Sequence, residues 1–451
     1  MKLQKARFHF VGIGGIGMCG LAELLHNLGV RVSGSDVAEN SHTERLKALG
    51  VIVHQGHRAE QVGEADVVVY SSAINAENPE IREARARGIP LIPRAEALAE
   101  IMRLKRGIAV AGTHGKTTTT SMTASILLEA KKGPTIFVGG RFDQIQSTAF
   151  LGDGEWMVAE ADESDGSFHK LAPEIAIITN IDSDHLDHFK SFENLQKAFV
   201  DFALKVPFYG LCIICGDDPR MRQIFETHTK RLLFYGFDPR NDLVLQGENG
   251  SYDIIEQNGS AKPLGRMKLN VPGRHNALNA LAAFAAARAA GVTVEEALRG
   301  LAKFGGVDRR FHFKGEKRGI AVYDDYGHHP TEVRAVLQAF KEKYPDRRLV
   351  VYFQPHRFSR TQHSWHDFLG CFVQADKILL TDIYPAGETP IPGITGEKLT
   401  EELKHDDKTY FVRDADSGRA IAGLLREGDV FVTLGAGDGW KLGLDVLKQL
   451  G

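Results

Sequence analysis

The sequence predicts an α/β protein with three domains. Two apolar segments, Phe8–Val11 and Gly107–Ala111, each run into a glycine-rich turn and then into a helical pattern, the order of strand, turn and helix found in nucleotide-binding α/β units. Apolar runs and helical patterns continue to alternate along the 451 residues, a length that suits about two to four domains. A polar helix end and, later, a charged segment mark the boundaries of the predicted domains, which are 1–106, 107–306 and 307–451.

Composition and charge disfavour several classes of partner and location. The 55 Lys and Arg residues nearly balance the 58 Asp and Glu residues, so no global field attracts nucleic acid or an anionic membrane, and anionic ligands need local sites. The N-terminus has no apolar signal core and no run reaches the length of a membrane span, so we expect a cytoplasmic location without membrane insertion. The four cysteines are too few for a disulfide framework, and the spacing of Cys212 and Cys215 puts them on opposite faces of one apolar strand, which disfavours zinc or redox chemistry.

The first glycine turn, Gly12–Gly17, opens the N-terminal segment. A second strand at 30–35 ends at Asp36, about 20 residues beyond the glycines, where a dinucleotide-binding fold places its ribose-binding acid. Alternation then continues with strands at 65–70 and 89–92 on either side of a helix at 80–87. This motif alone is weak, because NAD and a nucleotide sugar would both place a phosphate at such a helix N-terminus.

The second glycine turn, Gly112–Thr118, is the stronger signal for a nucleoside triphosphate. Backbone N–H groups of such a turn close around phosphate, while Lys116 and the hydroxyl of Thr117 address the outer phosphates and their Mg²⁺. Val110 stands where the full P-loop pattern has its first glycine, so the match rests on the shorter Gly-Thr-x-Gly-Lys-Thr core.

Polar clusters follow the apolar runs of the middle segment. The acidic run Glu160–Asp165 is either a solvated loop or a site for a hard divalent cation, and the run of acids and histidines at Asp182–His188 favours metal or substrate binding. Asn276 and Asn279 begin an alanine-rich helix, where their amides can cap and pack or can recognise an adenine edge.

The closing segment carries two further clusters. Tyr323–Pro330 ends in paired histidines, which serve either as turn and cap residues or in catalysis. Arg357 and Arg360 follow a strand, and a guanidinium fork suits the carboxylate of a free amino acid, with solvated surface arginines as the alternative. We hypothesise that His328 or His329 accepts the ammonium proton of such an amino acid, because only the neutral amine is nucleophilic.

Motifs of one known family occur here in that family's order: Gly12–Gly17, Gly112–Thr117, Glu160–Asp165, Asp184–His188, Gly273–Asn276, Asp325–Pro330 and Gln354–Arg357. Together they resemble the Mur ligases of peptidoglycan synthesis, and the resemblance covers nearly the whole chain. It implies a Rossmann-like N-terminal domain for a UDP-sugar, a central P-loop ATPase domain with a mainly parallel sheet, and a Rossmann-like C-terminal domain that closes over the site. The implied reaction turns the lactyl carboxylate of UDP-N-acetylmuramate into an acyl phosphate at the expense of ATP, and the amine of L-alanine then attacks it.

The resemblance also implies roles for individual residues. The ATP-binding residues would be Gly112, Thr113, His114, Gly115, Lys116, Thr117, Thr118, Asn276, Asn279, Arg310, Asp325 and Tyr326. The UDP-sugar-binding residues would be Gly14, Gly15, Ile16, Gly17, Asp36, Ser72 and Ser164. The catalytic residues would be Lys116, His185, Arg310, His328 and His329, and the amino acid would be bound by His329, Arg357 and Arg360. The implied Mg²⁺ ligands are Thr117, Glu160 and His185, and Mn²⁺ would tolerate the imidazole better.

One departure from the family selects a branch. Several relatives place a carbamylated lysine about fifteen residues after the metal-binding histidine, and by alignment this chain has Phe199 there. That departure points to the L-alanine-adding branch. A murein-recycling ligase that adds L-Ala-D-Glu-diaminopimelate is disfavoured because that branch tends to carry Tyr at Ser164. An NAD-dependent dehydrogenase and a non-catalytic nucleotide-binding regulator are the remaining alternatives, and glycine or L-serine as the amine stays open.

Overall fold

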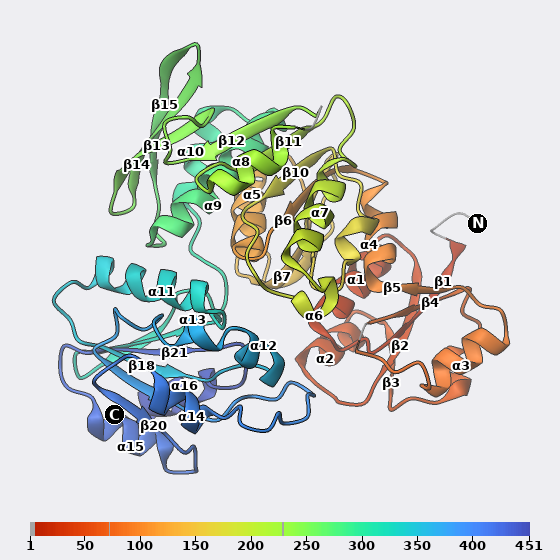
Figure 1. The fold of residues 1–451 in the computed structure, drawn as a ribbon. Coiled ribbons are helices and arrows are strands. Elements are labelled where there is room, and N and C mark those ends of the chain that lie inside the picture. The colour runs from red at the N-terminus through yellow and green to blue at the C-terminus, as the bar shows by residue number, and fades with distance from the viewer. Residues whose placement is uncertain (1–4, 72, 228–229) are drawn as a thin grey trace. The chain divides into compact units, whose positions relative to one another are not determined.

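Three sheets organise the chain, and the computed structural model describes residues 5–71, 73–227 and 230–451 (Figure 1). By contacts the chain forms two compact units. The first runs to 246 and includes 252–268 and 278–304, and the second contains 247–251, 269–277 and 305–451. In the part of the chain that the structure describes, no helix is both long and apolar enough to cross a membrane.

The N-terminal sheet has helices on both faces. Its strands are β1 (Arg7–Val11), β2 (Arg31–Asp36), β3 (Ile52–Gln55), β4 (Val67–Tyr70) and β5 (Leu91–Pro93), all parallel and ordered β3-β2-β1-β4-β5. Its α-helices are α1 (Ile16–Asn27), α2 (Ser41–Ala48), α3 (Pro79–Ala86) and α4 (Arg94–Met102). Side chains of α1 and α4 pack on one face and those of α3 on the other. The strand order reverses at β1, so the crevice beyond the ends of β1 and β4 is where such folds bind ligands.

A buried polar cluster closes the second face of this sheet. The carboxylate of Glu80, at the start of α3, accepts hydrogen bonds from Ser35 Oγ (2.5 Å), His57 Nδ1 (2.9 Å) and His9 Nε2 (3.1 Å). Glu80 and His9 have no exposed surface. Burial opposes the charge on Glu80, but hydrogen bonds from His9 and Ser35 lower its pKa below the ordinary value. The cluster therefore fixes the end of β2 that leads into Asp36.

Replacing Glu80 with alanine is expected to lower the free energy of unfolding by about 3 to 5 kcal/mol, because the buried His9 and Ser35 and the partly buried His57 lose their acceptor. Glu83→Ala, on the partly exposed face of the same helix, is the matched control and should cost less than about 1 kcal/mol. Because the folded pKa is lowered, the stabilisation is present above pH 4.5, the ordinary value, and is lost as the pH falls below it. Urea unfolding at pH 7 and pH 4 measures both effects, and equal losses for the two variants would contradict the assignment.

The central sheet carries the P-loop. Its strands are β6 (Arg106–Ala111), β7 (Thr135–Phe142), β8 (Ser147–Phe150), β9 (Trp156–Glu160), β10 (Ile175–Ile178), β11 (Leu211–Cys215), β12 (Leu232–Gly236), β13 (Leu243–Glu248), β14 (Ser251–Asn258) and β15 (Ser260–Lys268), ordered β15-β14-β13-β12-β11-β10-β6-β9-β7-β8. The α-helices are α5 (Lys116–Glu129), α6 (Leu186–Phe189), α7 (Phe192–Ala203), α8 (Pro219–Phe225), α9 (Arg274–Ala289) and α10 (Val294–Ala302). The strands from β9 through β6 and β10 to β13 pair in parallel. The register pairs Ala111 with Ile178 and Val110 with Glu160, so the segments after β6, β9 and β10 meet at one edge.

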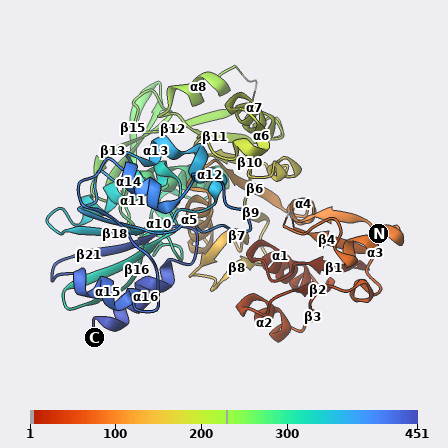
Figure 2. The ribbon, with the colours of Figure 1, turned by 60° about the horizontal axis from the view of Figure 1, so that its bottom comes forward.

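The C-terminal sheet is again covered on both faces (Figure 2). Its strands are β16 (His312–Lys317), β17 (Ile320–Asp325), β18 (Leu349–Phe353), β19 (Lys377–Leu380), β20 (Lys408–Tyr410) and β21 (Val430–Leu434), ordered β16-β17-β21-β18-β19-β20 with only the β16–β17 pair antiparallel. Its helices are α11 (Pro330–Lys343), α12 (Phe358–His363), α13 (Trp365–Phe368), α14 (Gly396–Glu402), α15 (Ser417–Leu424) and α16 (Trp440–Gln449). Alternate strand side chains pack against α11, α13 and α14 on one face and against α15 and α16 on the other. The prediction of a three-domain α/β chain with parallel sheets is confirmed.

Candidate active site

The P-loop lies between β6 and α5, in a conformation that requires glycine. Gly112 and Gly115 have φ of 131° and 83°, a region that side chains with a Cβ rarely adopt. A Cβ at Gly112 would lie 2.0 Å from Thr179 Oγ1, and a Cβ at Gly115 would lie 2.5 Å from Asn279 Oδ1. The His114 backbone N–H donates to Asn180 Oδ1 (2.9 Å), which fixes the middle of the loop. The turn thus brings backbone N–H groups to the N-terminus of α5, where phosphate binds favourably.

Lys116, the first residue of α5, is held by the loop itself. Its Nζ donates to the carbonyl oxygens of Gly112 (2.7 Å) and Thr113 (3.0 Å) and to Glu163 Oε1 (2.8 Å). Burial opposes its charge, but the carboxylates of Glu163, Asp162 and Glu160 raise the pKa of Lys116 above its ordinary value. A charged ammonium is therefore held in position at the phosphate end of the loop.

Glu163 has no exposed surface and was not among the predicted site residues. Burial raises its pKa, and the ammonium of Lys116 opposes that rise. Its second oxygen, Oε2, is buried and has no hydrogen-bond partner among the residues that the structure describes. A buried carboxylate oxygen in that state indicates a cation or a donor that is supplied by a ligand.

The three predicted metal ligands make two separate contacts, one between Thr117 and Glu160 and one between His185 and Glu163. Thr117 Oγ1 donates to Glu160 Oε2 (2.8 Å), so these two predicted ligands are in contact. His185 Nε2 lies 3.7 Å from Glu163 Oε1, and His185 has φ of 57°, a strained conformation for a residue with a Cβ. The oxygens of Thr117 and Glu160 and the unpartnered Oε2 of Glu163 are donors of the kind that a hard divalent ion prefers.

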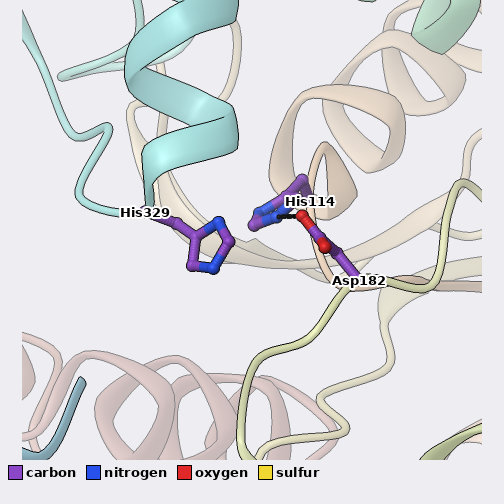
Figure 3. A group of neighbouring side chains, drawn as sticks. All are labelled: His114, Asp182 and His329. Carbon is purple, nitrogen blue, oxygen red and sulfur yellow. Dashed lines mark hydrogen bonds and ion pairs between the residues drawn. The ribbon is translucent and has the colours of Figure 1, made fainter. Parts of the chain in front are cut away.

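His114 and Asp182 form a pair beside the P-loop (Figure 3). The ring Nε2 of His114 lies 3.1 Å from Asp182 Oδ2, and the Asp182 backbone N–H donates to Thr113 Oγ1 (2.9 Å). The segment after β10 thereby holds the P-loop from the side. His329, also drawn in Figure 3, belongs to the second unit and is described below.

The first glycine turn lies at the N-terminus of α1, at the ends of β1 and β2. Gly15 caps this helix, and the residues that follow, Ile16 and Gly17, form its first turn. Asp36 Oδ2 accepts from the Gly14 backbone N–H (2.8 Å), so this acid shapes the turn. Ser164 lies in the acidic loop of the central domain, where its N–H donates to Asp162 Oδ1 (3.0 Å), and Ser72 lies outside the described residues.

The two asparagines of α9 are both buried. Asn279 lies beside Gly115 of the P-loop, and Thr118 lies in the first turn of α5. Asn276 Nδ2 donates to the carbonyl oxygen of Pro272 (2.7 Å). The amide of Asn276 therefore has a local structural contact, and that of Asn279 lies against the P-loop glycine, at the end of the helix where the sequence placed a nucleotide contact.

Three predicted ATP-binding residues of the second unit meet at the end of β17: Asp325 ends this strand, Tyr326 follows it, and Arg310, which precedes β16, packs on Tyr326. Asp325 is buried and accepts from the backbone N–H groups of Phe311 and Gly327, each at 2.7 Å. Burial raises the pKa of Asp325 to about 6, against the opposing effect of Arg310. The guanidinium of Arg310 lies 5.1 Å from the ring centre of Tyr326. These residues form one connected group.

The adjacent arginines Arg309 and Arg310 have different surroundings. Arg309 donates to Asp324 Oδ2 (3.0 Å) and to the carbonyl oxygens of Gly435 and Gly437 (2.6 and 3.1 Å), which makes it a structural residue that joins β17 to the segment after β21. Arg310 keeps a longer ion pair, 3.7 Å to Glu332 Oε1, and its side chain is 30% exposed. The two neighbouring arginines therefore have different partners: backbone carbonyl oxygens and Asp324 for Arg309, and Glu332 and the ring of Tyr326 for Arg310.

The two histidines differ in their hydrogen bonds. His328 Nδ1 lies 2.9 Å from the carbonyl oxygen of Tyr326, and because a carbonyl only accepts, Nδ1 carries the hydrogen of this bond. His329 is the N-cap of α11 and is buried, and its Nδ1 accepts the N–H of Thr331 (3.4 Å). In the neutral rings the lone pair is therefore on Nε2 of His328 and on Nδ1 of His329.

Arg357 and Arg360 lie around the N-terminus of α12. Arg360 Nη1 lies 3.4 Å from His356 Nδ1, while Arg357 Nε lies 3.9 Å from Glu388 Oε1. Burial lowers the pKa of His356 to about 4, and both arginines add to this effect, so the ring is neutral near pH 7. His356 also stacks on Tyr384, with 5.5 Å between ring centres. Arg357 has φ of 70°, which is strained for a non-glycine residue.

Phe199 belongs to a hydrophobic core. Its ring is fully buried in α7 and lies 5.3 Å from that of Phe168, in an edge-on arrangement. This position therefore offers packing surface and no ligand.

The residues that could not be assigned from the sequence are those that form hydrogen bonds to the motif residues or to their neighbours. Glu163 holds Lys116, Asp182 holds His114, Glu332 holds both histidine N–H groups, and Glu388 binds Ser359 next to Arg357. For Glu163 the signal was the density of carboxylates in Glu160–Asp165. Asp182 lies in the run Asp182–His188 that the sequence singled out, although its pairing with His114 was not predicted, whereas Glu332 and Glu388 are acids at ordinary positions that only the fold brings to these residues.

The fold and the site together define an ATP-dependent α/β enzyme with a P-loop, in which acidic loops provide for a divalent metal ion. Three descriptions of one family match successive parts of the chain: "Mur ligase family, catalytic domain" over 7–106, "Mur ligase middle domain" over 110–287 and "Mur ligase, glutamate ligase domain" over 309–437. The chain belongs to the Mur ligase family.

Named relatives extend over the full length. The chain is 72% identical to the UDP-N-acetylmuramate–L-alanine ligase of Bdellovibrio bacteriovorus, with all of both chains covered. It is 50% identical to the ligase of the same name from Solidesulfovibrio magneticus, over all of this chain and 99% of the other. The crystal structure of a UDP-N-acetylmuramate–alanine ligase from Thermotoga maritima matches 98% of this chain and 99% of that one, with a TM-score of 0.81 and 29% identity.

Proposed function

We propose that this chain joins L-alanine to the lactyl carboxylate of UDP-N-acetylmuramate, with hydrolysis of ATP to ADP and phosphate, in the synthesis of peptidoglycan precursors. The observation that carries the proposal is the P-loop in which Lys116 and Thr117 contact two carboxylates of one loop, Glu163 and Glu160. The choice of L-alanine is supported by full-length relatives that carry that name. We also propose the domain limits 1–106, 107–306 and 307–451, and a location in the cytoplasm, where ATP and UDP-sugars are made.

In the first step an oxygen of the lactyl carboxylate attacks the γ-phosphorus of ATP, an acyl phosphate forms and ADP leaves. Lys116 binds the outer phosphate oxygens as a point charge, and the P-loop N–H groups bind the phosphates from the α5 side. Thr117, Glu160 and His185 would hold a divalent ion, Mg²⁺ in this proposal, which when bound neutralises charge on phosphoryl and carboxylate oxygens. Arg310 adds a second cation toward the γ-phosphate, beside Asp325 and Tyr326.

In the second step the amine of L-alanine attacks the acyl carbon, inorganic phosphate leaves and an amide forms. The ammonium group of the incoming amino acid must first lose a proton, and His328 is the better acceptor because Nε2 holds the lone pair when Nδ1–H donates to Tyr326. Arg357 and Arg360 are the candidates for the carboxylate of L-alanine, since a guanidinium binds it through two parallel hydrogen bonds.

The test of this function measures phosphate release from ATP and Mg²⁺ with UDP-N-acetylmuramate, while the amine is varied. L-Alanine, glycine, L-serine, D-glutamate and the tripeptide L-Ala-D-Glu-diaminopimelate are compared, and product masses are checked. Release that needs both the UDP-sugar and L-alanine supports the proposal. Preference for the tripeptide would move the protein to murein recycling, and the absence of amine-dependent release would support a non-catalytic nucleotide-binding regulator.

The two arginines of α12 are expected to differ in their effect on L-alanine. Replacing Arg360 with lysine should raise the KM for L-alanine roughly 10-fold and leave the KM for ATP unchanged, because lysine lacks the guanidinium fork. Arg357→Lys is the matched variant and should have a smaller effect, since Glu388 already offsets its charge. Initial rates over a range of L-alanine concentrations decide the question, and equal effects of the two variants would contradict this assignment.

A further inference from the structure

Arg94 lies across the first turn of α1, at the glycine turn of the N-terminal domain. A Cβ built on Gly17 would lie 3.0 Å from Arg94 Nη1 and 3.2 Å from its Cδ, so the arginine side chain occupies the space above that glycine. Arg94 is the first residue of α4, directly after β5, and its side chain is 23% exposed.

The strand register explains why Arg94 reaches this turn. Val11, the last residue of β1, pairs with Tyr70, and Tyr70 pairs with Pro93, so the ends of β1, β4 and β5 form one edge. The glycine turn and Arg94 both follow that edge, on the two sides of the crevice where the strand order reverses. The guanidinium of Arg94 therefore lies near the N-terminus of α1, which itself favours negative charge.

The guanidinium has a weak partner across the domain boundary within the first unit. Its Nη2 lies 3.4 Å from Asp162 Oδ2, in the acidic loop after β9, and the side chain of Asp162 is 39% exposed. A single long contact between partly exposed groups contributes little to stability. It holds Arg94 in place and can be exchanged for a stronger anionic partner.

We propose that Arg94 binds the diphosphate of the UDP-sugar at the N-terminus of α1, and that the diphosphate replaces Asp162 as its partner. The inference rests on the proposed function, which supplies the UDP-sugar. A diphosphate carries about two negative charges, and the planar guanidinium fork matches two phosphate oxygens in a way that one carboxylate oxygen at 3.4 Å does not. Gly17 fits this arrangement because any side chain there would displace the guanidinium.

The lactyl carboxylate of the same substrate is a second anion, so the test must separate the two. UDP-N-acetylmuramate, UDP-N-acetylglucosamine, which has the diphosphate but no lactyl carboxylate, and UMP are titrated calorimetrically into the full-length chain and its variants. For Arg94→Met we expect affinity for both UDP-sugars to fall by the same factor, roughly 10- to 100-fold, with little change for UMP and for ATP. Arg103→Met, at the other end of α4 and paired with Glu100 on the surface, is the matched control and should change none of them.

A second variant tests the exchange of partners. Asp162→Asn removes the competing carboxylate, so affinity for UDP-N-acetylglucosamine should rise by roughly 2- to 5-fold. Arg94→Lys keeps the charge but lacks the guanidinium fork, so we expect it to recover part of the lost affinity. If Arg94→Met lowers the melting temperature, Arg94→Lys is used for the binding comparison instead.

Several outcomes would overturn the inference. Loss confined to UDP-N-acetylmuramate would assign Arg94 to the lactyl carboxylate, and equal loss for UMP would assign it to the first phosphate or the nucleoside. If Arg94→Met binds every ligand as the unaltered chain does, Arg94 has only a structural role, in its ion pair with Asp162. Failure of the unaltered chain to bind either UDP-sugar would instead count against the proposed function itself.

Discussion

Replacing Lys116 with methionine is expected to lower the rate of phosphate release by about 10²- to 10³-fold at saturating substrates, because one preorganised charge on the transferring phosphoryl group is lost. Methionine keeps most of the side-chain length, so the P-loop geometry set by Gly112 and Gly115 should persist. The same change leaves the buried carboxylate of Glu163 without its ammonium partner.

The control for this prediction is Lys131→Met, an exposed lysine just after α5, which should retain full activity. The double variant Lys116→Met with Glu163→Gln separates catalysis from folding, since it removes the unpaired charge. We expect it to recover stability but not activity. Activity of Lys116→Met within tenfold of the unaltered chain would show that the lysine does not address the reacting phosphate.

The second large effect is expected at His328. His328→Gln should lower kcat/KM for L-alanine by about 10²- to 10⁴-fold, because the proton acceptor is lost. In the unaltered chain the rate should rise with pH as the acceptor imidazole loses its proton, and that rise should disappear in the variant. Amine-dependent phosphate release between pH 5.5 and 9 measures both features.

His329→Gln is the matched variant, because this ring caps α11 through Nδ1 and is buried. We expect a loss below tenfold at saturating L-alanine, an unchanged pH profile, and a loss of about 1 kcal/mol in stability from the weakened cap. A larger rate loss in His329→Gln, or an unchanged pH profile in His328→Gln, would reverse the assignment of the two rings.

Local motifs could be predicted from the sequence, because their geometry follows from the residues themselves. The glycines at 112 and 115 adopt the positive φ that a phosphate-binding turn requires, and the apolar run before them is a buried strand. The alternation of strands and helices likewise predicted the parallel sheets, since parallel strands need a crossover between them. The confirmed family assignment also removes the dehydrogenase alternative, which left Lys116 and the acidic loop without a function.

Long-range partners could not be predicted in the same way. Lys116 and Glu163 are 47 residues apart, and His114 and Asp182 are 68 residues apart, so only the order of β6, β9 and β10 in the sheet brings them together. Sequence alone also could not separate Arg309 from Arg310, which are neighbours of the same type. The structure distinguishes them because the guanidinium of Arg309 donates hydrogen bonds to backbone carbonyl oxygens after β21.

The buried phenyl ring of Phe199 has a consequence for the conditions under which this chain works. A carbamylated lysine forms by reversible addition of carbon dioxide, so a ligase that uses one depends on dissolved CO₂ for a working site. Here the position is filled by a ring that packs edge-on against Phe168, which in turn stacks on Phe202. We therefore expect the activity of this chain to be independent of bicarbonate supply, with a divalent-ion site that needs no modified side chain.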